Sequence, residues 1–265
     1  MAITSVDDIA SGIASGIAYP FLKVLAAAKA IGSWQSGWLA AGKPGAGSAP
    51  PAYTAGSGYT CSRTTNGALG QTNGSIQNWL ARLTAASTVP ATLLIYDRLW
   101  SCGGMGFAAS TYTVTTPGSL PARITDGGVG VEAFVEQFVT AGAASGTLTF
   151  NYLDQGGAAG VGVVAAVVSA PVPGQLQPIP LAVGDTGVSQ VTSVVTSATW
   201  TSGSFGITLA KRVAAIPLSI AGLAADRDWA IALSKVPADA CLMFAIQATA
   251  TTAATLQGGL TIIDK

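Results

Sequence analysis

The chain has 265 residues, of which 49% are apolar and only 9% carry a charge, with twelve acids balancing twelve bases. An ordinary soluble domain has about 25% charged residues. The apolar content excludes charge-rich disorder, and the length allows one large β domain or two smaller units with a real core. So few charges protect a lone subunit poorly against self-association, which favours a surface that meets other subunits. The alternative is a surface without neighbouring subunits that is solvated by Ser, Thr, Asn, Gln and Gly, as on many secreted β proteins.

No apolar run is long enough for a membrane-spanning helix, which needs about 20 residues. The run Val161 to Ala170 is short and is followed by Pro171, and the amino-terminal stretch is interrupted by Pro20. Asp7 and Asp8 lie where a secretory signal carries basic residues. We therefore expect a soluble protein made in the cytoplasm.

The residue types that usually carry chemistry are scarce. Histidine is absent, which removes the commonest general base and zinc ligand. Cys61, Cys102 and Cys241 form neither a CxxC pair nor a disulfide framework. We expect buried thiols, with a Cys61–Cys102 bridge as the alternative. We expect no metal and no cofactor.

Carboxylate pairs are the remaining candidates for catalysis. Glu132 and Glu136 share one side of a strand, or of a helix, and two acids can flank a sugar. Asp226-Arg227-Asp228 is more typical of a local ion pair or an inter-subunit contact. A third pair is Asp7/Asp8. Spacing alone has little specificity, so we expect no catalytic residue and no enzyme.

Glycine, basic and aromatic clusters indicate no ligand. Gly103 to Gly106 and Gly127 to Gly130 lack the spacing of a phosphate-binding loop, and we interpret both as turns. Lys211-Arg212 is the only adjacent basic pair, which disfavours nucleic acid. Six Trp and six Tyr could form a sugar platform. Most of them lie in apolar patterns, which favours a core or an interface.

The first thirty residues predict a helix. Ser5 with Asp8 has the form of a capping box. Ile9, Ile13 and Ile17 recur every four residues beside a smooth row of Gly12 and Gly16, which predicts close packing on another element. Pro20 should kink or end the helix, and apolar residues continue its face to about Ala30.

The segment from Gly32 to Tyr59 is rich in Gly and Pro, and its apolar residues follow neither a helical nor a strand periodicity. This predicts an extended arm or ordered connector held by its aromatic residues. We divide the chain into an amino-terminal helix and arm, residues 1–60, and a β-rich body, residues 61–265. The apolar and aromatic residues of the first part are candidate assembly contacts: Ile9, Ile13, Ile17, Phe21, Trp34 and Trp38.

The body begins with two turns, Asn66-Gly67 and Asn73-Gly74, and a short helical pattern that Ser75 opens and that places Trp79 and Leu83 on one side. Strands are then predicted at Thr92–Trp100, Val129–Val135, Thr147–Leu153, Val161–Ser169, Val188–Thr199, Phe205–Lys211, Ala240–Thr249 and Leu256–Ile263. Val213 to Trp229 is less clear, and its Asp226–Trp229 segment could start a helical turn. Strands without alternating helices predict an antiparallel sandwich or jelly roll.

Three blocks in the carboxyl-terminal half carry a resemblance to a known family. The run Leu181 to Val191, with the sequence LAVGDTGVSQV, resembles a motif of uncharacterised tailed-bacteriophage virion proteins. Ala215–Leu218 and Asp239–Leu242 resemble two further blocks in the same order, and Ile3-Thr4-Ser5 and the Trp34 region resemble the start of that family. The chain departs from the family pattern at Asn66–Ser75, where the family has a histidine-containing segment.

The resemblance implies a structural protein of the virion without catalytic residues. A major capsid protein should have a long charged spine helix, a tail-tube protein should be smaller, and a fibre should have repeats or heptads. By elimination we expect an accessory protein of the head, a decoration or cement protein that grips the shell through its amino-terminal segment. Its partners would be other copies of itself, with a trimer as one option, and the major capsid protein or other virion proteins. A tail or glycan-binding receptor component is the alternative, and a carboxylate glycosidase is a third.

Overall fold

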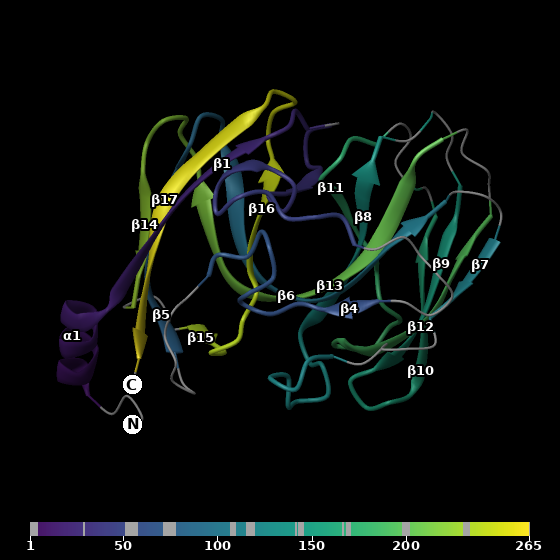
Figure 1. Cartoon of the computed structure of the whole chain (residues 1–265), viewed down its shortest axis with the longest axis horizontal. Coiled ribbons are helices and arrows are strands. Elements are labelled where there is room, and N and C mark those ends of the chain that lie inside the picture. Colours follow the sequence, from purple (N-terminus) through teal and green to yellow (C-terminus); the bar gives the residue numbers. More distant parts are fainter. Residues whose placement is uncertain are drawn as a thin grey trace. The chain divides into compact units, whose positions relative to one another are not determined.

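The computed structural model describes residues 5–28, 30–50, 58–70, 78–106, 110–114, 120–140, 142, 146–165, 167, 171–197, 202–229 and 234–264. Strands make up 56% and helix 5% of these residues, and the sheets are antiparallel, which confirms the predicted mainly β, sandwich-like fold (Figure 1). The chain divides into two compact units. Unit 1 comprises Met1–Gly47, Ser62–Asp97 and Val213–Lys265, and unit 2 comprises Ser48–Cys61 and Arg98–Arg212.

Unit 1 contains a sheet with the strand order β14-β5-β17-β1-β3, in which β15 also pairs with β5. These strands are β14 (Ala225–Asp228), β5 (Asn78–Ser87), β17 (Ala254–Asp264), β1 (Ile17–Leu25), β3 (Ala41–Lys43) and β15 (Ser234–Val236). Its core also receives side chains from β16 (Leu242–Ala248), the first half of β6 (Ala91–Met105) and the end of β13 (Ser204–Leu218). β16 pairs with both β6 and β2 (Trp34–Ser36). Phe21 and Phe244 meet across this core, with their ring centroids 4.4 Å apart.

Unit 2 contains a second sheet with the order β10-β9-β12-β7. Its strands are β10 (Ala159–Val164), β9 (Leu148–Asp154), β12 (Val188–Thr196) and β7 (Ser110–Thr113). The facing strands are β8 (Val131–Val139), which pairs with β11 (Gln175–Pro178) and β13, and β6, which pairs with β4 (Tyr59–Thr60). Phe150 and Phe205, from opposite layers, are both fully buried in the core.

The long strands β6 and β13 belong to both units. Residues up to Asp97 of β6 lie in unit 1 and those from Arg98 in unit 2, whereas β13 passes from unit 2 to unit 1 after Arg212. Both sequence-predicted parts, residues 1–60 and 61–265, contribute to each unit.

The amino-terminal helix is shorter than predicted. Helix α1 spans Val6–Ser15, and both hydrogen bonds of the Ser5–Asp8 capping box are present. The predicted continuation to Ala30 is wrong, because Ile17–Leu25 forms strand β1. Buried and exposed residues alternate from Tyr19 to Leu25, which is the period of a strand. Pairing with β17 and β3 supplies the hydrogen bonds that a helix would have supplied.

Three further local predictions are corrected. The helical pattern at Trp79–Leu83 is part of strand β5, and Asp226–Asp228 lies in strand β14. Gly103-Gly104-Met105 continues strand β6 and is not a turn, whereas the turns at Asn66-Gly67 and around Gly127 are present. In each wrong case a distant strand pairs with the segment, a contact that local periodicity does not record. Asn73-Gly74 and Ser75 lie outside the described residues.

All eight strands predicted between Thr92 and Ile263 are present, with ends that shift by a few residues. Within the described part of Gly32–Tyr59, the short strands β2 and β3 occur, and Trp38 is 1% exposed. The described part of this segment is therefore ordered, and one of its aromatic residues is buried. No helix among the described residues is long and apolar enough to cross a membrane.

Candidate functional site

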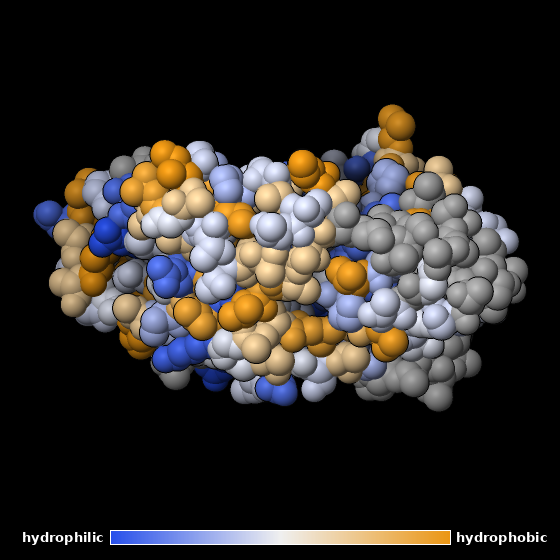
Figure 2. Space-filling model, turned by 90° about the horizontal axis from the view of Figure 1, so that it is seen from above, coloured by the Kyte–Doolittle hydropathy of each residue, from blue (hydrophilic) through white to orange (hydrophobic). Residues whose placement is uncertain are grey.

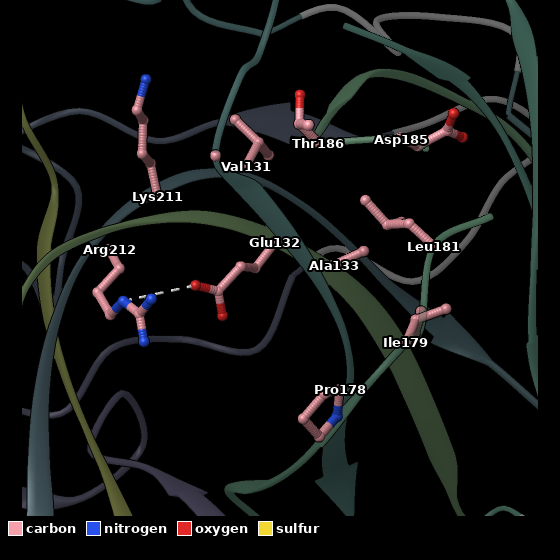
Figure 3. A pocket seen from close by; sticks show the side chains of 11 residues that line it. Val131, Glu132, Ala133, Pro178, Ile179, Leu181, Asp185, Thr186, Lys211 and Arg212 are labelled. Atoms are coloured by element: carbon pink, nitrogen blue, oxygen red, sulfur yellow. Dashed lines mark ion pairs between the residues drawn. The ribbon is translucent and has the colours of Figure 1, made fainter. Parts of the chain in front are cut away.

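A pocket of unit 2 lies where the pairing between β8 and β11 ends (Figure 3). Its volume is about 580 Å³. Ile179 N donates to Ala133 O at 2.9 Å, and Gly130 N donates to Thr186 O at 2.8 Å. Between these two bonds the chain from Pro180 to Asp185 separates from β8, because proline cannot donate to the ladder and a turn follows. The pocket occupies the gap in the ladder.

One wall of the pocket is formed by the segment Leu181–Val191, through Asp185 and Thr186. The Tyr152 hydroxyl donates to Asp185 Oδ2 at 2.5 Å and accepts from Ala182 N at 2.8 Å. Gln155 Oε1 accepts from Thr186 N at 2.9 Å. Burial raises the pKa of Tyr152, and its hydrogen bond to Asp185 adds to this, so the phenol stays protonated and continues to donate. These bonds fix the wall in one conformation.

The opposite wall carries charges of both signs. Arg212 Nε lies 3.8 Å from Glu132 Oε1, and Figure 3 shows the two side chains directed toward each other. Lys211 Nζ is 2.5 Å from Asp126 Oδ2. Partial desolvation acts to raise the pKa of Asp126, but the hydrogen bond and charge of Lys211 outweigh it and hold that pKa below its usual value. Among the residues that line the pocket, the acids Glu132 and Asp185 balance the bases Lys211 and Arg212, so the pocket favours neither anions nor cations.

The floor of the pocket is apolar, with Val131, Ala133, Ile179 and Leu181. None of the described residues that line it is aromatic, so a sugar ring would have no surface on which to stack. The arrangement can bind an amphipathic group, with apolar contacts at the floor and hydrogen bonds at Glu132, Arg212 and Thr186.

A second charged cluster of unit 2 is completely buried. Arg98 Nη1 lies 2.6 Å from Glu136 Oε2, and both side chains are 0% exposed. Thr208 Oγ1 donates to the same carboxylate at 2.5 Å, and Arg98 Nη2 donates to Ser101 Oγ at 2.7 Å. Burial alone would lower the pKa of Arg98, but the carboxylate of Glu136 raises it above its usual value. The cluster is a structural ion pair, because no substrate could reach it.

The predicted carboxylate pairs do not form an open acid–base site. Glu132 borders the pocket, whereas Glu136 is buried in its ion pair with Arg98. Asp226 is paired with Arg82 of β5 at 2.5 Å, so the expected ion pair exists but joins two strands instead of near neighbours. Asp8 caps helix α1. Among the described residues, no group of three or more acids and cysteines could hold a metal.

The candidate assembly contacts have different surroundings. Ile9, Phe21 and Trp38 are buried within the chain's own packing, at 8%, 3% and 1% exposure. Ile17 is 41% exposed, and Ile13 and Trp34 are half-buried. The predicted Gly face of the helix packs on β17 of the same chain, because a Cβ on Gly16 would lie 3.1 Å from Ile263 Cγ2.

The three cysteines are buried thiols, as predicted. Cys61 N donates to Leu99 O, which places Cys61 beside Leu99 of β6. Cys102 lies three residues further along that strand, or about 10 Å, and a disulfide needs Cα atoms within about 7 Å. The register therefore excludes the Cys61–Cys102 bridge.

Comparisons with known proteins add no identification. The chain matches no family model, no curated protein and no solved structure.

Proposed function

We propose that this protein is a structural component of a bacteriophage virion, in which it decorates or cements the head shell. The observation that carries the proposal is the outer surface of strand β1 in unit 1. Its outward positions Leu22 and Val24 are 41% and 49% exposed, and the loop residues Ile220 and Leu223 are 60% and 57% exposed. Large apolar side chains at such positions are characteristic of surfaces that meet another protein.

The charge distribution supports the same role. Figure 2 shows one face of the molecule, on which hydrophobic side chains lie among weakly polar ones and strongly hydrophilic side chains are few. Lys23, Asp97, Arg98 and Glu136 are buried, so the surface holds even fewer charges than the composition indicates. Such a surface is poorly suited to a monomer at high concentration and well suited to a subunit with neighbours.

The experiment is a count of copies in purified particles. A decoration protein should be present in a fixed ratio to the major capsid protein, at tens to hundreds of copies, and should occupy the outside of the shell in averaged images. Absence from particles would refute the virion role. A few copies at the tail would refute the decoration role alone.

The pocket of unit 2 supports a second candidate, a tail component that binds a host-cell ligand. Its fixed wall and polar groups are suited to a small amphipathic ligand. Adsorption of the purified chain to host cells, compared with that of Arg212→Ala, tests this role. Binding that the substitution abolishes would favour it over decoration.

A further inference from the structure

Strand β10 is the last strand of the unit 2 sheet β10-β9-β12-β7, and among the described strands only β9 pairs with it. Its six residues, AGVGVV, include no charged residue and no proline, and its pairing with β9 runs without a bulge. Charged residues, proline, bulges and very short strands are the features by which proteins keep an edge strand from pairing with another chain. β10 has none of them.

The other strands that end a described sheet do carry such features. β14 contains the charged run Asp226–Asp228, β15 contains Lys235, and β3 has three residues and ends at Lys43. β7 has four residues, all Ser, Thr or Tyr, and β4 has two. β13 pairs with β6 as well as with β8. Among the edges that the structure describes, β10 is therefore the long and unprotected one.

Hydrogen bonds show which backbone groups of β10 point away from β9. Asp154 N donates to Ala158 O at 2.8 Å, so residue 158 directs its backbone groups toward β9. Ser197 N donates to Thr147 O at 3.0 Å, which assigns the odd-numbered residues of β9 to β12 and leaves the even-numbered ones to β10. The N–H and C=O of one residue point to the same side of an antiparallel strand, and those of the next residue point to the other side. The residues of β10 whose backbone groups point to the open edge are thus Ala159, Val161 and Val163.

The apolar side chains of the outer face lie along this edge. Val161 is 51% and Val163 is 44% exposed. On β9 the residues opposite these two valines are Asn151 and Thr149, and Asn151 Nδ2 donates to Ser193 Oγ of β12 at 2.9 Å. The outer face is therefore polar on its inner strands and apolar at its edge, where an added strand would cover the valines.

We propose that β10 pairs with β10 of a second copy of the chain, antiparallel, about a twofold axis that passes through Val161 perpendicular to the sheet. Val161 then faces Val161 of the second copy, and Ala159 faces Val163. In this register every outward N–H and C=O of the three residues is paired, and the two sheets join into one continuous sheet. The proposal deepens the assembly role above and rests on it for its place in the particle.

The edge meets the requirements for pairing with itself. A twofold axis places the central residue of the strand opposite itself, so a charge at that position would be repelled by its own copy. The central residue is Val161, and the net charge of the whole chain is zero, so two copies approach without repulsion. The outward residues of one strand match those of the other with none left unpaired.

The contact is small when it acts alone. Stable interfaces bury at least about 1,000 Å², which is more than the edges of two six-residue strands provide. Isolated subunits should therefore pair weakly. The pairing becomes persistent where other contacts already hold copies side by side, as in a shell.

Sedimentation equilibrium of the purified chain, from micromolar to submillimolar concentration, tests the edge. The wild type should show a monomer–dimer equilibrium in this range. Val161→Lys should raise the dimer dissociation constant about tenfold or more, because it places two ammonium groups opposite each other. The matched control is Val139→Lys on β8, since Val139 is 52% and Val161 is 51% exposed. A wild type that stays monomeric, or an equal effect of both substitutions, would overturn the proposal.

Cysteine cross-linking tests the register. In the proposed pair the Cα atoms of residue 161 in the two copies lie about 5.5 Å apart, which a disulfide can span. Under oxidation Val161→Cys should therefore form a disulfide-linked dimer at a higher yield than Val139→Cys, and the three native cysteines are buried and do not compete. Equal yields for these two variants would contradict the pairing.

A mixture of two variants fixes the position of the axis. Ala159→Cys mixed with Val163→Cys should cross-link, because these residues face each other. Either variant alone should not, since two copies of the same residue are then about 13 Å apart along the ladder. If Val163→Cys cross-links with itself better than with Ala159→Cys, the axis does not pass through Val161.

These experiments separate the pairing from the virion role. A dimer that Val161→Lys weakens, in a chain that is absent from particles, keeps the pairing and removes the virion role. A chain that is abundant in particles but monomeric in solution keeps the virion role and removes the pairing. If Val161→Lys nevertheless fails to enter particles in that case, the edge binds a strand of another virion protein instead of a second copy.

Discussion

The buried ion pair of unit 2 gives the sharpest stability prediction. Glu136→Gln keeps the volume of the side chain but leaves the Arg98 guanidinium, 2.6 Å away and 0% exposed, without its carboxylate. Removing one partner of a buried pair costs about 3–5 kcal/mol. That is a large part of the roughly 5–15 kcal/mol by which a domain is stable. We therefore expect the urea midpoint of unit 2 to fall sharply or its folding to fail.

The assay is urea unfolding followed by tryptophan fluorescence, to which Trp100 of unit 2 contributes from a fully buried position. Glu132→Gln is the matched control on the same strand, because Glu132 is 34% exposed and lies 3.8 Å from Arg212. Loss of such a surface pair should cost less than about 1 kcal/mol. A loss below about 1 kcal/mol for Glu136→Gln as well would refute the reasoning. Arg98→Met with Glu136→Leu should recover most of the stability, since the pair is then replaced by apolar groups.

Three further predictions concern other buried groups. Burial lowers the pKa of Lys23 to about 8 from 10.5, so the unfolded state binds more protons between these values and stability rises with pH there. Relative to Lys23→Met, the wild type should gain about 1 kcal/mol in the free energy of unfolding from pH 7 to pH 9, and a flat difference would contradict this. A Cβ on Gly206 would lie 2.0 Å from Cys102 O, so Gly206→Ala should cost about 1–3 kcal/mol or more, whereas Gly45→Ala, with nothing within 4 Å, should be nearly neutral in the same urea titration. Burial raises the pKa of Cys102 to about 11, so a thiol reagent at pH 8 should label the native chain only as fast as it unfolds, while Val161→Cys, at a position that is 51% exposed, should be labelled at once.

The sequence was informative where a strand is long and apolar and its ends carry turn residues. It failed at Ile17–Leu25, where the apolar residues satisfy both a helical and a strand period. Only pairing with β17, at the opposite end of the chain, decides between them. The same holds for Trp79–Leu83, which β17 flanks on one side and β15 and β14 flank on the other. A register between distant strands cannot be obtained from local periodicity.

The candidate site was less predictable than the fold. The Leu181–Val191 block was identified as a motif, but its role as a pocket wall depends on Tyr152 and Gln155, which belong to a different hairpin. Glu132 and Glu136 were treated as a pair, yet one faces the pocket and the other faces Arg98 in the interior. Glu136 is paired with buried Arg98 and Glu132 with exposed Arg212, and strand pairing sets both neighbours.

The structure shows where the few charged residues of the chain lie. Burial of Lys23, Asp97, Arg98 and Glu136 takes four charges from a chain that has only twelve of each sign. Asp226 and Lys211 are used in surface ion pairs with Arg82 and Asp126. Few charges are then left to keep the outer face of the unit 1 sheet apart from its neighbours. The low charge and the exposed apolar row of β1 both weaken the hydration of this face, which is the property that the proposed docking surface requires.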